Sequence, residues 1–279
     1  MPASAGRRSV AAVKAHEGTE ESMKLVATAS VALLAAVSLY VGAHSVEDAP
    51  ARSATDSRAT VPLKEAKLNI EHNATDKDTG FQGFIDSEGW RRLDVSGPRG
   101  KVLTFRGRGA LGRLGLTELF FETVEPENKD TSIKKMLSKL PEGKYRIAGT
   151  AQENGERIGR TAGTALLTHD IPAGPRLVSP AEGATVPTRG IVADWEPVSK
   201  TITGKPARIV AYQLIIEKDA DPPRHLIGKF GLSMYLPPSV TSIDVPDGFL
   251  EPRTAYSWEV LAIERSGNQT LSSGSFRTG

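Results

Sequence analysis

Apolar and polar residues alternate in short runs over most of the chain after residue 66. A period of two is typical of a strand that buries one face. The alternation is clearest in AYQLIIEKD (211–219) and TAYSWEVLAIE (254–264), and prolines recur between these runs. Proline at this density excludes long helices. The pattern predicts an antiparallel β-sandwich for residues 175–279.

Residues 67–170 show a similar series of strand-like runs, separated by glycine and proline turns, and predict a second sandwich of unknown family. One segment, DTSIKKMLSKLPEG (130–143), breaks this pattern. It predicts a short amphipathic helix, capped by Asp130 or Thr131, whose apolar side chains belong to the core and not to a partner groove. These side chains are Ile133, Met136, Leu137 and Leu140.

An uncharged apolar run from Leu25 to Ala43 follows Met23 and Lys24. A basic flank before such a run is typical of a signal peptide, with cleavage after Ala43 or Ser45, and the position of the flank suggests that translation starts at Met23. The run is also long enough to remain as a membrane anchor. We therefore expect a signal peptide or N-terminal anchor in residues 1–45 and membrane attachment through 25–43 if the run is retained.

Residues 46–66 are small, polar and charged and predict a flexible linker between the leader and the first sandwich. The two sandwiches are then expected at 67–170 and 175–279, separated by the Pro-rich segment Ile171–Pro175.

The chain of 279 residues carries 35 Lys+Arg against 33 Asp+Glu, a net charge of +2, and has no cysteine. The small net charge argues against nucleic acid as a partner. The lack of cysteine excludes disulfides, cysteine nucleophiles and thiolate metal sites. An exported chain without disulfides is typical of a bacterial envelope, so we expect a periplasmic or cell-surface protein, released or anchored in the inner membrane.

The string LEPRTAYSWEVLA (250–262), followed by Ser266-Gly267-Asn268, resembles the E to F region of a fibronectin type III domain. The resemblance covers residues 175–279. It implies that the Tyr256 hydroxyl closes a tyrosine corner and that Trp195 and Tyr212 are core residues. The proline-rich stretch 219–241 departs from the family pattern.

The fold expected from these observations is all-β: two tandem antiparallel β-sandwich (immunoglobulin-like) domains, the first with one short helix, after an N-terminal signal or anchor helix. The Arg-Gly-Asp tripeptide is absent from the sequence, so the family resemblance adds no support for an integrin role.

Two basic segments of the first sandwich are candidate binding sites. Trp90 adjoins two arginines, an aromatic and basic cluster suited to contact and the first to test, although burial of Trp90 in the core is the favoured interpretation. The segment GRGALG (107–112) matches a dinucleotide fingerprint, but β-rich sequence follows it where a helix is required. A glycine-rich turn, or a backbone nest that grips an anionic glycan with the neighbouring arginines, fits better. The candidate binding residues are Trp90, Arg91, Arg92, Arg106, Arg108 and Arg113.

No metal ligand set or cofactor motif is complete. Asp76 and Asp78 imitate a calcium loop, but the glycine and the glutamate that should complete it are each displaced by one position, and we expect a polar turn. Calcium binding there is left open. His72 and His169 would have to meet in space to form a metal or acid–base cluster. We predict no metal and no cofactor.

Signatures of hydrolases, P-loop proteins and zinc peptidases are absent from the sequence. We therefore expect a non-enzymatic interaction protein of the cell envelope that uses sandwich surfaces to contact another protein or a glycan. The alternative is an envelope polysaccharide hydrolase or its accessory carbohydrate-binding module, for which acidic pairs such as Glu118 and Glu122 could serve.

Overall fold

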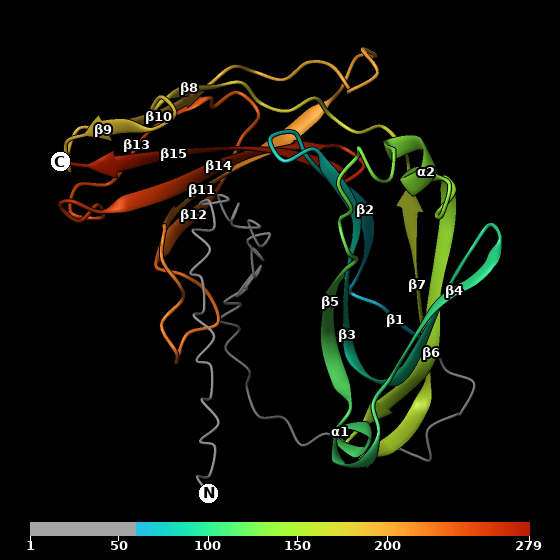
Figure 1. Ribbon diagram of the computed structural model, residues 1–279. Coiled ribbons are helices and arrows are strands. Elements are labelled where there is room, and N and C mark those ends of the chain that lie inside the picture. Colours follow the sequence, from blue (N-terminus) through green and yellow to red (C-terminus); the bar gives the residue numbers. More distant parts are fainter. Residues whose placement is uncertain (1–59) are drawn as a thin grey trace, which may run out of the picture. The chain divides into compact units, whose positions relative to one another are not determined.

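The computed structural model describes residues 60–279, and this part of the chain consists mostly of β-strands (Figure 1). The all-β prediction is confirmed for it. The predicted signal or anchor run (25–43) and residues 46–59 of the predicted linker lie outside the described residues. Within residues 60–279, no helix is long and apolar enough to cross a membrane.

Residues 60–171 form an N-terminal sandwich of seven strands and two short helices. Its elements are β1 (Thr60–Pro62), β2 (Glu65–Asn73), β3 (Asp78–Gly97), β4 (Gly100–Arg106), α1 (Gly109–Leu114), β5 (Leu116–Glu122), α2 (Ile133–Leu137), β6 (Gly143–Glu153) and β7 (Glu156–Leu167).

One long strand, β3, belongs to both layers of this sandwich. Its first half pairs with β2 and β5, and its second half pairs with β4 and β6. Strand β7 pairs with β6, and β1 adds to β7 in parallel. Because β1 begins at Thr60, the end of the predicted linker (46–66) is part of the sheet and not a flexible tether.

Alternating apolar residues of these strands meet in one hydrophobic cluster, which α2 covers at one end. Met136 is 3% exposed, and the three other apolar residues predicted for this helix pack against the same cluster. The predicted amphipathic helix is therefore confirmed. Its cap is Ser132, whose Oγ accepts a hydrogen bond from the Lys135 N–H, and not Asp130 or Thr131 as expected.

The N-terminal sandwich contains a second helix, which corrects the prediction of a single one. Helix α1 occupies most of the segment that was expected to be a glycine-rich turn. Leu111 and Leu114 are exposed on it, so the helix buries no apolar stripe and leaves no helical periodicity in the sequence. A Cβ at Gly112 would lie 2.7 Å from the Gly107 carbonyl oxygen, so this tight excursion requires glycine.

Residues 177–279 form a C-terminal sandwich of two sheets. Its strands are β8 (Leu177–Ser179), β9 (Ala184–Val186), β10 (Val192–Trp195), β11 (Ile209–Lys218), β12 (Gly231–Leu236), β13 (Ser242–Asp244), β14 (Ala255–Glu264) and β15 (Gln269–Thr278). One sheet has the order β13-β10-β8, and the other runs β12-β11-β14-β15, with β9 added to β15.

The aromatic residues predicted to hold this sandwich together are buried in its core. Trp195 and Trp258 are 2% and 0% exposed, and Trp195 meets Tyr212 edge-on with ring centroids 5.6 Å apart. The Tyr256 hydroxyl accepts a hydrogen bond of 2.8 Å from the Glu251 N–H, which is the predicted tyrosine corner. The segment 219–241, which departs from the family pattern in the sequence, contains a long loop followed by strand β12.

A continuous sheet joins the two sandwiches, although each keeps its own hydrophobic cluster. Strand β15 pairs in parallel with β2, from Gln269 opposite Glu71 onward. Asn268 is 1% exposed at this junction; its Oδ1 accepts a hydrogen bond from the Ile70 N–H and its Nδ2 donates to the Thr168 carbonyl oxygen. The domain boundaries expected at 67–170 and 175–279 remain predictions.

Candidate functional site

The outer face of the N-terminal sandwich carries a row of arginines. Arg106 on β4 lies opposite Arg92 on β3, and Arg92 lies opposite Thr150 on β6, which in turn faces Arg160 on β7. Residues opposite one another on neighbouring strands project from the same face. The three exposed guanidinium groups therefore lie on one surface across four strands.

A second row of bases runs parallel to the first. Ser96 on β3 is opposite Lys101 on β4 and Arg146 on β6. The rows are four residues apart along β3, so about 13 Å separates them. Asp94 lies between the rows and bonds to both, at 3.1 Å from the Arg92 Nη2 and 3.2 Å from the Lys101 Nζ.

Asp94 is strongly held in its ionised form. A hydrogen bond of 2.6 Å from the Thr104 hydroxyl, aided by the neighbouring bases, lowers the pKa of the Asp94 carboxyl to about 2. Its charge offsets only part of the positive charge around it, and like charges directly opposite each other on a sheet are destabilising. The Arg106–Arg92 pair therefore does not contribute to the stability of the sheet through its charges.

Helix α1 adds arginines at the end of this face. The register shift between Trp90 and Arg92 places both Arg91 and Arg92 outside, and Arg91 accepts a hydrogen bond from the Gly107 N–H through its carbonyl oxygen. Arg108 precedes α1 and Arg113 ends it, and both are exposed. We call the whole set the basic face: Arg91, Arg92, Lys101, Arg106, Arg108, Arg113, Arg146 and Arg160.

Apart from the bonds to Asp94, the basic face forms no ion pair with any carboxylate between residues 60 and 279. Guanidinium groups stay charged at every physiological pH and bind carboxylate, sulfate and phosphate through paired N–H donors. A flat array of such donors suits an extended polyanion better than a single small anion.

Trp90, predicted together with these arginines as a contact residue, has to be withdrawn from the site. It is 0% exposed and belongs to the core cluster, with its Nε1 3.4 Å from the Thr117 carbonyl oxygen. The strand irregularity beside it turns the indole inward while the next two side chains turn outward. The five predicted arginines are exposed, and Lys101, Arg146 and Arg160 are members that the sequence reasoning missed.

The glycine-rich segment lacks the structural context of the dinucleotide fingerprint. That fingerprint needs neighbouring strands of a parallel sheet joined by a helix, whereas β4 and β5, which flank α1, each pair antiparallel with β3 and do not pair with each other. Helix α1 is also only six residues long.

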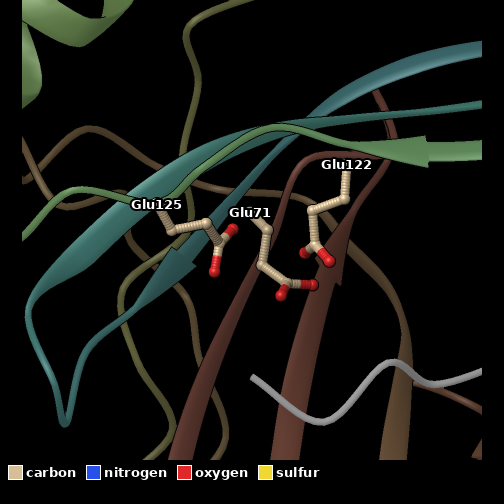
Figure 2. A group of neighbouring side chains, drawn as sticks. All are labelled: Glu71, Glu122 and Glu125. Carbon is tan, nitrogen blue, oxygen red and sulfur yellow. The ribbon is translucent and has the colours of Figure 1, made fainter. Parts of the chain in front are cut away.

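A second cluster, which the sequence did not predict as a group, brings three carboxylates together (Figure 2). Glu71 on β2, Glu122 at the end of β5 and Glu125 just after β5 each offer an oxygen within 4.8 Å of the others. Glu71 is 7% exposed and accepts a hydrogen bond from the Gln269 amide, while the Gln82 amide donates to Glu122 at 2.9 Å.

The Glu125 side chain lies directly over Gly80. A Cβ at Gly80 would come within 2.5 Å of the Glu125 Oε1, so any other residue there would displace the carboxylate. This oxygen is buried and has no hydrogen-bond partner among the described residues.

Burial dominates the electrostatics of the carboxylate cluster. Burial, together with the repulsion of the neighbouring carboxylates, raises the pKa of Glu71 to about 7 and that of Glu125 to about 8. Such a group can hold a proton at neutral pH and share it with its neighbours. Oxygen ligands at this spacing are also able to hold a hard cation such as Ca²⁺.

The other candidate ligands are not members of this cluster, although the Asp78 carboxylate is close enough to help raise the pKa of Glu71 and Glu125. Asp76 accepts a hydrogen bond of 2.9 Å from the Asn73 side chain in the turn after β2, as expected of a polar turn. Burial raises the pKa of Asp78 to about 6. His72 lies 2.8 Å from the Asp78 carbonyl oxygen, whereas the His169 Nε2 lies 2.9 Å from the Leu140 carbonyl oxygen, so each histidine is engaged locally.

No family model matches this sequence, and no curated protein matches it. Solved structures match at low identity. A two-domain fibronectin type III segment of chicken tenascin is 12% identical, with 77% of this chain and 99% of that chain covered and a TM-score of 0.28.

Two further solved structures give similar values. The FN1–FN3 domains of chicken CNTN1 are 13% identical, with 78% of this chain and 64% of that chain covered and a TM-score of 0.29. A tetra-tandem repeat from the extending region of a large adhesion protein is 12% identical, with 77% and 50% covered and a TM-score of 0.27. This chain therefore spans about half to two thirds of these two structures.

These neighbours are fibronectin type III and adhesion-protein segments. The resemblance of residues 177–279 rests on their own strand order and on the tyrosine corner at Tyr256. The C-terminal sandwich thus has a fibronectin type III-like fold.

Proposed function

We propose that this chain is a non-enzymatic, exported protein of the cell envelope that binds an anionic glycan through the basic face of its N-terminal sandwich. The observation that carries the proposal is the row Arg106–Arg92–Arg160, three exposed arginines on one flat surface without enough carboxylates to neutralise them.

Rigid strands support such binding because they fix the spacing of the charged groups. Alternate strands of a sheet lie about 10 Å apart, so Arg92 and Arg160 project at that separation before any ligand arrives. Fixed donors lose less conformational entropy on binding than donors on a flexible loop. The ligand then needs acidic groups repeated along an extended chain, as uronate-containing or sulfated polysaccharides have.

The test is charge reversal on the row. The triple variant Arg92→Glu, Arg106→Glu, Arg160→Glu should weaken binding of the full chain to a uronate polysaccharide on the order of a hundredfold, since each exposed charge contact is worth up to about 1 kcal/mol. Affinity should also fall as salt is raised, because exposed charges are screened.

The matched control reverses three exposed bases of the C-terminal sandwich: Lys200→Glu, Lys205→Glu, Arg208→Glu. It makes the same change in net charge and should leave affinity almost unchanged. Equal losses in the two triple variants would mean that only total charge matters, and the proposal would fail. Binding to an acidic protein but to no polysaccharide would assign the basic face to a protein partner instead.

Glycoside hydrolysis is a second candidate because the carboxylate cluster places acids with raised pKa values beside another carboxylate. Such pairs serve as acid and nucleophile in glycosidases. Against it, Glu71 is 7% exposed and engaged by Gln269, so little of its carboxylate can meet a substrate. Reducing-end release that disappears in Glu71→Gln and Glu125→Gln would establish this activity in place of simple binding.

A further inference from the structure

The N-terminal sandwich contains a cavity of about 280 Å³ between its two layers, and the cavity is open to solvent. Side chains from β2, β3, β4, β5 and the α2 region line it, and nearly all of them are apolar. They include Leu68, Val95, Val102, Phe121, Met136 and Leu140. The basic face projects from the outside of the sheet, so this cavity is a separate feature.

The cavity reaches the surface because the sandwich is not closed along one side. Strands β4 and β5 pair with β3 alone among the described strands, and α1 separates them along the chain. Val124, which follows β5, lines the cavity and is 85% exposed, so it marks the mouth. A ligand can therefore enter without unfolding of the domain.

The volume suits a single hydrocarbon chain. An apolar cavity of about 150 Å³ in another protein stays dry and takes up benzene, so a cavity nearly twice as large has room for roughly ten to twelve carbon atoms. The lining offers few polar groups; Thr123 is one. A polar or branched ligand such as a sugar would lose its hydrogen bonds inside.

The mouth carries positive charge. Lys139 lines the cavity just after α2, and the Arg99 Nη1 donates a hydrogen bond of 3.0 Å to the carbonyl oxygen of the adjacent Ser138. The nearby Glu142 is engaged by the His169 N–H. An anionic group at the mouth would meet the Lys139 ammonium, with the Arg99 guanidinium bonded to the residue next to it in the chain.

We propose that this cavity binds a single-chain anionic amphiphile of the fatty-acid type, with the alkyl chain inside the sandwich and the carboxylate beside Lys139. The occupant is taken up as a free molecule and is not a bilayer surface. The binding adds a lipid-like ligand to the glycan contact proposed above and does not depend on it.

Calorimetric titration of the full chain with alkyl carboxylates of increasing length tests the proposal. Each added methylene should tighten binding about fourfold, which is the transfer of one buried methylene from water. The gain should stop near twelve carbons, when the cavity is full. Affinity that does not change with chain length, or no binding at any length, would overturn the proposal.

Two variants with matched controls locate the ligand. Val124→Trp should block the mouth and abolish binding, and the variant should fold normally because Val124 is largely exposed. The control is Val210→Trp, at a valine of the C-terminal sandwich that is 42% exposed, and it should bind the ligand normally. Lys139→Glu should weaken carboxylate binding about two- to fivefold. Lys135→Glu, at an exposed lysine of α2 that does not line the cavity, should not.

A neutral alcohol of the same chain length separates the contribution of the alkyl chain from that of the carboxylate charge. Its affinity should be lost in Val124→Trp and unchanged in Lys139→Glu. Normal binding in Val124→Trp would place the ligand elsewhere and contradict the proposal, as would equal effects of the two lysine variants. Uptake from phospholipid vesicles but not of free alkyl carboxylates would show a membrane contact and contradict it too.

Discussion

Replacement of Glu71 by Gln should remove a loss of stability that we expect in the wild type as the pH rises from about 4.5 to about 7. Burial raises the pKa of this carboxyl from its ordinary 4.5 to about 7, so the folded protein holds a proton that the unfolded chain releases. A folded-state pKa above the unfolded one contributes stability in full below about pH 4.5 and loses it as the pH rises through 7.

The size of the effect follows from the two pKa values. Moving a carboxyl pKa from 4.5 to about 7 corresponds to about 3 kcal/mol between the protonated and ionised forms. Glutamine at this position keeps the shape and an acceptor oxygen for the Gln269 amide but cannot ionise. We therefore expect Glu71→Gln to match the wild type at pH 5 and to exceed it by about 2 to 3 kcal/mol at pH 9.

Urea unfolding at pH 5, 7 and 9, followed by tryptophan fluorescence in the presence of EDTA, measures this difference. EDTA removes any divalent ion that would neutralise the cluster and hide the effect. The control is Glu118→Gln, at an exposed carboxylate on the same strand as Glu122, which should leave the pH profile unchanged. A Glu71→Gln profile parallel to that of the wild type would refute the reasoning, because the buried charge would then cost nothing.

Three further predictions concern the fold and the N-terminus. Tyr256→Phe removes the acceptor for the Glu251 N–H and should cost about 1 kcal/mol of unfolding free energy without changing glycan affinity; a lost affinity with intact stability would contradict this. Asn268→Ala leaves two backbone groups of the N-terminal sandwich, the Ile70 N–H and the Thr168 carbonyl, without the Asn268 side chain as partner and should cost about 2 to 3 kcal/mol, measured by urea unfolding. An unchanged unfolding midpoint would contradict the role of Asn268 at the junction. N-terminal sequencing of the exported protein should begin at His44 or Val46 if the leader is cleaved, and an intact run at 25–43 would show an anchor.

Alternation along the strands was enough to predict the β-fold and much of its core. Trp258 and Tyr212 lie at inward positions of their strands, and both are buried as the pattern requires. The α2 segment was predictable for the same reason, since its apolar residues recur at helical spacing. Helix α1 was not, because its Leu111 and Leu114 face solvent.

The basic face could be predicted only in part. Arg91, Arg92 and the arginines around α1 are near one another in the sequence, whereas Arg146 and Arg160 join them only through the register of β6 and β7. Sequence alone does not fix register between strands that are distant along the chain.

Trp90 was named as a candidate contact residue together with the arginines and is buried instead. The strand irregularity between Trp90 and Arg92 decides which of these side chains face inward, and the sequence does not reveal it.

The carboxylate cluster had no sequence signal as a group. Glu71 and Glu122 are brought together because both β2 and β5 pair with β3, and Glu125 joins them across Gly80. The continuous sheet that joins the sandwiches could not be predicted either, because it depends on the parallel pairing of β15 with β2, two strands that are far apart in the sequence.

The most direct test of glycan binding by the basic face is arginine footprinting. The full chain is treated with an arginine-specific dicarbonyl reagent with and without a uronate polysaccharide, and modification is read by peptide mass spectrometry. We predict strong protection of Arg92, Arg106 and Arg160 and none of Arg189 or Arg277 in the C-terminal sandwich. Equal modification with and without the polysaccharide, or protection confined to the C-terminal sandwich, would contradict the account.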